Sequence, residues 1–162
     1  EKAFVKRIES IVLSNPNVLG IHDLVVHDYG PGRVMISLHA EVPASGDMLH
    51  LHDAIDNIER DLNRELHCEA VIHMDPIATD DEEVNITRRS VAELCKDIHE
   101  DLSIHDFRMV KGPTHTNLIF DVVIPFALKL SDKEVTDEIR KRISQKWDNY
   151  YAVIEVDHSY VL

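Results

Sequence analysis

Long hydrophobic runs, closely spaced cysteines and an excess of basic residues are all missing from this 162-residue chain. No apolar run approaches the roughly 20 residues of a membrane-spanning helix, and no signal segment precedes the first expected helix. Cys68 and Cys95 are far apart, which argues against a disulfide framework or a cysteine zinc site and fits a reducing cytosol. With 17 basic against 30 acidic residues, the formal charge of −13 argues against nucleic acid as a partner and favours cationic ligands.

Aromatic residues are also scarce, at 6%, whereas histidine is abundant, with 11 copies. Histidine is the commonest side-chain ligand for zinc, so the composition raises the question of a metal site. The hydrophobic fraction of 44% is enough for a core, and the length allows one domain or two of about 80 residues. Because the chain begins with Glu1 rather than Met, we expect it to be a piece of a longer protein.

The periodicity of the first half predicts the order helix, strand, strand, helix, strand. Apolar residues recur at helical spacing before Asn15 and again after Asp47, and they alternate strictly between Val34 and Val42. Gly30, Pro31 and Gly32 predict the turn of a hairpin between the first two strands. The expected elements are a helix at 4–14, strands at 18–27 and 34–42, a helix at 47–66 and a strand at 69–74.

The same order returns in the second half, with a helix at 87–102, strands at 105–110 and 118–124, a helix at 131–147 and a strand at 152–157. Landmark residues repeat with it: Gly30 and Gly112, Pro43 and Pro125, and Asp75 and Asp157 are each 82 positions apart. We interpret this as a tandem duplication of a ferredoxin-like α+β unit with an antiparallel sheet. The predicted domains are residues 1–78, an acidic linker at 79–86, and a degenerate repeat at 87–162.

Several metal-ligating side chains of the first half are predicted to share one side of the sheet. Strand alternation puts His39 on the polar face and puts His73 and Asp75 together on one face, while His22 lies on a neighbouring strand. His52 lies on the helix, off its apolar stripe. One such histidine alone would more often be solvated, but the set of five is what a zinc site with imidazole and carboxylate ligands needs.

The second half carries oxygen ligands at most of the corresponding positions: Asp121 for His39, Glu155 for His73, Glu134 near the place of His52, with His105 and Asp157 retained. Carboxylates suit harder ions such as manganese, magnesium or calcium. The second half therefore either binds a different metal weakly or has lost the site, and acidic residues on a solvated face are ordinary in so acidic a chain. We expect loss or weak binding.

The first half resembles the carboxy-terminal domain of the cation diffusion facilitator family. The resemblance spans about residues 4–77 and is carried by four motifs: G-I-H-D-L at 20–24, the G-P-G-R hairpin at 30–33, S-L-H-A-E-V at 37–42 and V-I-H-M-D-P at 71–76. The family's cytosolic metal ligands match His22, His39, His52, His73 and Asp75. A second, degenerate copy is a departure from the family's usual pattern.

The resemblance implies a metallochaperone-like fold that projects into the cytosol below a six-helix transmembrane domain of the same chain, absent from these residues. It implies a homodimer that closes when metal binds between facing acidic surfaces, and thereby regulates export of a divalent cation. Zinc is the expected ion from the histidines, and manganese is the alternative from the longer architecture and the carboxylates. No catalysis is expected, because the transport site of such a protein lies in its membrane domain.

Two other functions compete with a metal-sensing domain. A metal-dependent phosphohydrolase would use His39, His52 with Asp53, and Asp75 in an H…HD…D order, but that order belongs on a helical bundle rather than on alternating strands. A small-molecule-sensing ferredoxin-like module would be favoured by glycines at the junctions of strands and helices, and the chain has only five glycines.

Overall fold

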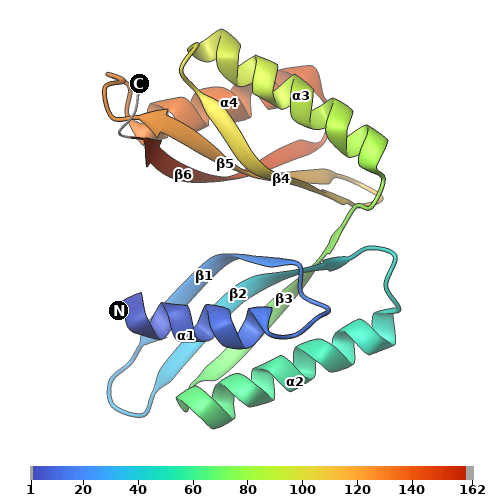
Figure 1. The fold of residues 1–162 in the computed structure, drawn as a ribbon, viewed down its shortest axis with the longest axis vertical. Coiled ribbons are helices and arrows are strands. Elements are labelled where there is room, and N and C mark those ends of the chain that lie inside the picture. The colour runs from blue at the N-terminus through green and yellow to red at the C-terminus, as the bar shows by residue number, and fades with distance from the viewer. Residues whose placement is uncertain (1, 160–162) are drawn as a thin grey trace. The chain divides into compact units, whose positions relative to one another are not determined.

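The computed structural model describes residues 2–159, and the chain divides into two compact units, Glu1–Ile77 and Ala78–Leu162. The first unit contains α1 (Lys2–Leu13), β1 (Gly20–Asp28), β2 (Val34–Pro43), α2 (Met48–Leu66) and β3 (Glu69–Ile77). The second contains α3 (Asp81–Ile98), β4 (Ser103–Lys111), β5 (Thr116–Pro125), α4 (Asp132–Lys146) and β6 (Tyr150–Ser159). Both units follow the predicted order, and the α+β class is confirmed (Figure 1).

Each unit has one three-stranded sheet, with the second of its strands in the middle. The hairpins β1–β2 and β4–β5 are antiparallel, as predicted. The third strand of each sheet, however, is parallel to the middle strand, so the prediction of wholly antiparallel sheets is wrong and both sheets are mixed. The reason is the connection: α2 and α4 each return the chain to the end of the sheet from which the middle strand began, and such a crossover makes the next strand parallel.

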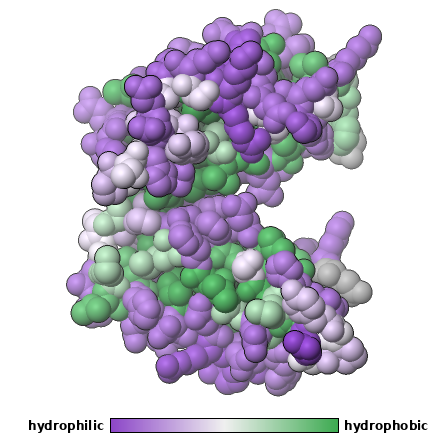
Figure 2. Space-filling view, turned by 180° about the vertical axis from the view of Figure 1, so that it is seen from behind, coloured by the Kyte–Doolittle hydropathy of each residue, from purple (hydrophilic) through white to green (hydrophobic). Residues whose placement is uncertain are grey.

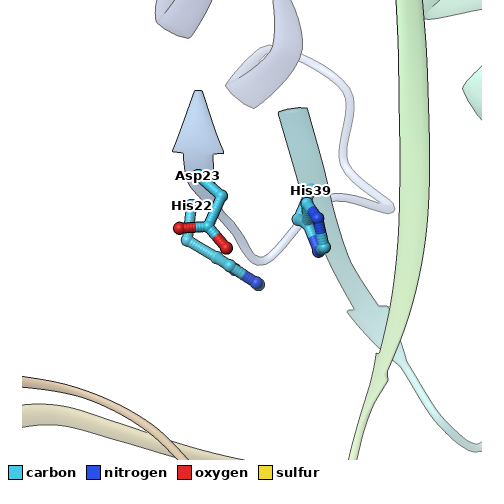
Figure 3. Close-up of side chains that lie close together, drawn as sticks. All are labelled: His22, Asp23 and His39. Atoms are coloured by element: carbon cyan, nitrogen blue, oxygen red, sulfur yellow. The ribbon is translucent and has the colours of Figure 1, made fainter. Parts of the chain in front are cut away.

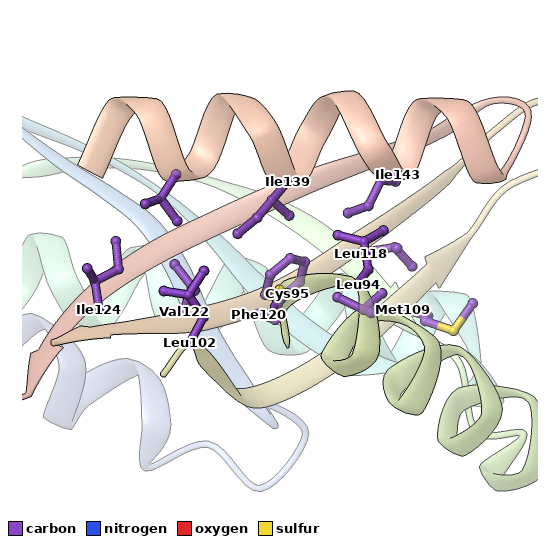
Figure 4. Close-up of a cluster of buried hydrophobic side chains, with 12 residues drawn as sticks. Leu94, Cys95, Leu102, Met109, Leu118, Phe120, Val122, Ile124, Ile139 and Ile143 are labelled. Carbon is purple, nitrogen blue, oxygen red and sulfur yellow. The ribbon is translucent and has the colours of Figure 1, made fainter. Parts of the chain in front are cut away.

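Two helices cover one face of each sheet. Strand alternation buries every second residue of β2 against α1 and α2, namely Ile36, Leu38 and Ala40. In the second unit the corresponding β5 residues Leu118, Phe120 and Val122 pack against Ile139 and Ile143 of α4 (Figure 4). Among residues 2–159 no helix is both long enough and apolar enough to span a bilayer. The other face of each sheet is left for Ser37, His39 and Glu41 and their counterparts.

Unusual backbone conformations recur at equivalent places in the two units. Asp23 and Asp106 have φ angles of 52° and 51°, at an irregularity in the first strand of each sheet. His67 and Asn149 have φ angles of 52° and 57°, just before the third strand. Aspartate and asparagine tolerate this left-handed conformation better than most residues. The repetition supports the interpretation of a tandem duplication, because the backbone repeats even where side chains differ.

The acidic residues predicted as a linker at 79–86 lie mostly in a helix. α3 begins at Asp81 rather than at Thr87, and the Asp80 side chain accepts a hydrogen bond from the Glu83 backbone N–H at 3.3 Å. Acidic side chains at a helix N-terminus satisfy unpaired N–H groups and interact favourably with the helix dipole. The charge run that suggested a solvated linker is therefore the start of a helix.

We expect the core of the second unit to be sensitive at Ile139, which is completely buried on α4. Ile139→Ala should lower the free energy of unfolding of this unit by about 2–5 kcal/mol, because it leaves a cavity. The measurement is urea unfolding followed by fluorescence of Trp147, the one tryptophan of the chain, which packs against this core. Ile86→Ala, at a residue of the same unit that is 54% exposed, is the matched control and should cost under about 1 kcal/mol. Equal losses for the two variants would contradict the packing described.

Candidate metal centre

Three histidines, one from each strand of the first sheet, form a row on the face turned away from the helices. Strand pairing sets His22 opposite His39, and His39 opposite His73. The ring centroids are 4.8 Å apart for His22 and His39 and 4.7 Å apart for His39 and His73. Figure 3 shows the side chains of His22 and Asp23 beside that of His39. The row is a product of strand register, since these residues are far apart in the sequence.

The carboxylate of Asp75 joins the three histidines. Its Oδ2 atom lies 2.9 Å from His39 Nδ1 and 3.1 Å from His22 Nε2, and its Oδ1 atom lies 3.2 Å from His73 Nε2. Burial acts to raise the pKa of Asp75, but hydrogen bonds from His22 and His39, with the charges of His39 and His73, lower it below its usual value. Asp75 is thus a charged acceptor shared by all three rings. We call His22, His39, His73 and Asp75 the histidine cluster.

A second carboxylate, that of Glu41, contacts His22 from the other side of its ring. Glu41 Oε2 lies 3.1 Å from His22 Nδ1, and Glu41 and His22 are only 2% and 9% exposed. Burial acts to lower the pKa of His22, but its hydrogen bonds to Asp75 and Glu41 and their negative charges raise this pKa to about 9. His22 therefore connects two buried carboxylates.

The geometry of the cluster fits a zinc ion. Two overlapping sets of three residues each bring one ligand atom per residue within 4.8 Å of the others: His22, Asp23 and His39, and His39, His73 and Asp75. Ligand atoms around a tetrahedral zinc, at bonds of about 2.0–2.1 Å, are about 3.3 Å apart. Imidazole nitrogens with a carboxylate are ligands that zinc prefers.

Four of the five residues predicted as metal ligands lie in this cluster, and His52 does not. His52 is exposed on α2, a helix that packs through Ile55 and Ile58 on the opposite face of the sheet. Helical spacing placed His52 off the apolar stripe correctly, but it carried no information about which face of the sheet the helix covers. Within one chain, the structure therefore separates His52 from the other four residues.

Two residues of the site were missed at the level of sequence, Asp23 and Glu41. Alternation did place Glu41 on the same strand face as His39, but an acidic residue on a polar face is ordinary in so acidic a chain. Only its burial against His22 distinguishes it. Asp23 is one of the residues within reach of a metal. However, its left-handed backbone conformation, which is repeated at Asp106, already explains why an aspartate occurs at this position.

The second sheet reproduces the register of the first but not its chemistry. His105 pairs with Asp121, and Asp121 pairs with Glu155, so carboxylates replace two of the three imidazoles. Glu134, expected near the place of His52, instead accepts from the Ser131 backbone N–H in a helix capping box. Over the part of the chain that the structure describes, the two sets of possible metal ligands named above both lie in the first unit. Loss of the site or weak binding in the second unit therefore stays a prediction.

The fold and the site define the first unit as an α+β domain with a histidine-rich cluster on its open sheet face. Residues 1–77 match the family model described as "Cation efflux protein, cytoplasmic domain". Over these residues the first unit thus matches the cytoplasmic domain of cation efflux proteins, as the motifs predicted. The match is to the cytoplasmic domain of a transporter rather than to an enzyme, and it ends where the first unit ends.

Individual relatives match the same half of the chain. The cation-efflux pump FieF of Yersinia enterocolitica is 38% identical over 74 residues, which cover 45% of this chain and 24% of that protein. An uncharacterized transporter of Methanocaldococcus jannaschii is 33% identical over 69 residues, covering 36% of this chain and 24% of that protein. The chain thus spans about a quarter of the length of these relatives. A solved structure of CzrB, described as a proposed zinc transporter, is 26% identical and covers 47% of this chain and 95% of that one, with a TM-score of 0.44.

The carboxylates of the second sheet predict a pH-dependent stability. Burial, with the charges of Glu155, Asp157 and Asp106, raises the pKa of Asp121 to about 6, whereas aspartate in an unfolded chain titrates near 4. Between about pH 4 and 6 the folded state therefore keeps a proton that the unfolded state releases, so stability falls as the pH rises through this window. Asp121→Asn should raise the melting temperature at pH 7 and leave it unchanged at pH 4, as measured by Trp147 fluorescence.

Asp148→Asn is the charge-matched control for this prediction, because Asp148 is an exposed aspartate of the same unit. It removes the same charge from the protein without touching the sheet face. If Asp148→Asn stabilised the protein at pH 7 as much as Asp121→Asn, net charge rather than the local cluster would be the cause.

Proposed function

We propose that this chain is a regulatory, dimer-forming cytosolic part of a divalent-cation efflux transporter, and that its first unit senses cytosolic metal. The observation that carries the proposal is the convergence of three imidazoles on the single carboxylate of Asp75, with distances of 2.9–3.2 Å. All three histidines contact this one carboxylate. A bound cation would instead use the ring nitrogens as its own ligands and would add the positive charge that these carboxylates attract.

Zinc is the proposed ion, with manganese as the alternative. The histidine cluster offers three nitrogen ligands and one oxygen ligand, a set that suits zinc better than the harder manganese ion. The carboxylate-rich positions of the second sheet would suit manganese. However, burial, together with the charges of Glu155, Asp157 and Asp106, raises the pKa of Asp121, so a negative charge on this face is disfavoured.

A second copy of the chain is the proposed partner of the first unit. The sheet face that carries the histidine cluster also exposes apolar side chains, among them Val71 at 61%, Val25 at 44% and Met35 at 39%. Hydrophobic areas lie among hydrophilic ones on the face drawn in Figure 2. Two copies of so acidic a chain repel each other, and a bound cation would weaken that repulsion. Because His52 lies away from the cluster of its own chain, only a second copy could bring it to a metal there.

The transport activity itself is assigned to the longer protein. The chain covers 24% of the length of each of the two relatives, one of them named as a transporter and the other as a cation-efflux pump. We propose that the rest of the protein contains the membrane domain, and that metal binding here favours one state of that domain. The phosphohydrolase alternative loses its support, since His52 and Asp53 on α2 lie on the other side of the sheet from His39.

Zinc binding should depend on the histidine cluster. Asp75→Asn and His73→Ala each remove a ligand, and we expect a loss of zinc affinity greater than the roughly 10–100-fold typical of an outer-shell change. Calorimetric titration of the chain with zinc, and then with manganese, measures it. His27→Ala is the matched control, because His27 is a β1 histidine that contacts Tyr29 rather than the cluster, and it should bind zinc normally. Manganese binding that survives both cluster variants would instead point to the carboxylates of the second unit.

Zinc should also shift the chain toward a dimer. Light scattering after size-exclusion chromatography, with and without zinc, should show a larger mass with the metal for the unmodified chain and for His27→Ala. Asp75→Asn should lose the zinc-dependent increase, because the cation that offsets the acidic repulsion no longer binds. A mass that does not respond to zinc, in a chain that calorimetry shows to bind it, would refute the proposed coupling between metal and dimer.

A further inference from the structure

Glu41 is a charged residue buried in a position where nothing in the hydrophobic core requires it. It is 2% exposed, and glutamate is almost never fully buried unless it is paired. Its side chain points away from the core, because its neighbours Ala40 and Val42 occupy the face of β2 turned toward the helices. Its carboxylate contacts His22, whose Nδ1 lies 3.1 Å from Glu41 Oε2.

The backbone opposite Glu41 is shaped to admit its carboxylate. Gly20 pairs with Glu41 across β1 and β2. A Cβ atom at position 20 would lie 3.1 Å from Glu41 Oε2, 3.3 Å from its Cδ and 3.4 Å from its Oε1. The φ angle of Gly20 is not positive, so the glycine is needed here for the space it leaves and not for an unusual backbone conformation. Gly20 and Glu41 thus act together to hold a carboxylate against His22.

The second unit lacks this arrangement at the same register. Ser103 stands opposite Val123 where Gly20 stands opposite Glu41, and His105, the counterpart of His22, is exposed. The two units therefore share the strand pairing and the histidine but differ in the buried carboxylate. The fold does not need a carboxylate at this position, and Glu41 occurs in the unit that has the histidine cluster.

We propose that Glu41 is a positioning residue for the metal site: by accepting the Nδ1–H of His22 it fixes the ring orientation and leaves Nε2 to bind the metal. The proposal rests on the proposed metal-sensing function. His22 Nε2 already faces the ligand set, at 3.1 Å from Asp75 Oδ2. A metal-bound histidine commonly donates its other ring N–H to a carboxylate, which fixes the tautomer and raises the basicity of the ligand.

The first test is the tautomer of His22 in the zinc-loaded chain, read from nitrogen-15 NMR of the imidazole. We expect a proton on Nδ1 and zinc on Nε2. The opposite tautomer, or a His22 ring that does not respond to zinc, overturns the proposal without any variant having to fold.

The second test is calorimetric zinc titration of Glu41→Gln. We expect about a 10–100-fold loss of affinity, because an amide can either donate or accept and so no longer fixes one tautomer. Gly20→Ala keeps the charge of Glu41 but crowds its carboxylate, and should lose affinity in the same direction by a smaller factor. Glu69→Gln is the control for charge: Glu69 is an exposed glutamate on the same face of the sheet, and its variant should bind zinc within about twofold of the unmodified chain.

The outcomes separate this inference from the proposed function. If Glu41→Gln and Gly20→Ala bind zinc as the unmodified chain does, while His73→Ala does not, Glu41 has no positioning role and the metal-sensing function stands. If the unmodified chain itself fails to bind zinc, both the metal-sensing function and the positioning role of Glu41 are wrong. If circular dichroism shows that Glu41→Gln is unfolded, the zinc affinity of Gly20→Ala and the His22 tautomer of the unmodified chain decide whether Glu41 has a positioning role.

Discussion

The parallel pairing of β2 with β3 is the constraint on which the candidate site depends. In this register His39 lies beside His73 and Glu41 lies beside Asp75. The antiparallel pairing of β1 then adds His22 to one end of the row. A shift of either strand by one residue would turn its polar side chains into the core and its apolar ones outward. The apolar alternation that packs against α1 and α2 therefore also sets the alignment of the candidate metal ligands.

The electrostatics of this row differ between the two units. In the first unit two buried carboxylates are each hydrogen-bonded to histidine, so their negative charge is compensated within the cluster. In the second unit Asp121 is partly buried beside the acidic side chains of Glu155, Asp157 and Asp106, and burial together with their charges raises its pKa to about 6. The same backbone thus holds a compact ligand set in one case and a self-repelling surface in the other.

The duplication separates structural residues from functional ones. The left-handed aspartates, Asp23 and Asp106, persist in both units at the same strand irregularity, so the fold is enough to explain them. The buried carboxylate of Glu41 and the close approach at Gly20 occur only in the first unit among these paired positions. At these positions the second unit keeps the backbone but has other side chains. The fold alone therefore does not explain why the first unit has Gly20 and Glu41 there.

The sequence by itself determined the order of helices and strands in both units, the duplication, and the strand face of His39, His73 and Asp75, because helical and strand periodicity depend only on neighbouring residues. It did not determine the parallel third strand, the helical start of the acidic segment, the separation of His52 from the cluster, or the burial of Glu41 against His22. These depend on which strands pair, in which direction, and on which face the helices pack. Such contacts join residues distant in the chain, and only the tertiary structure brings them together.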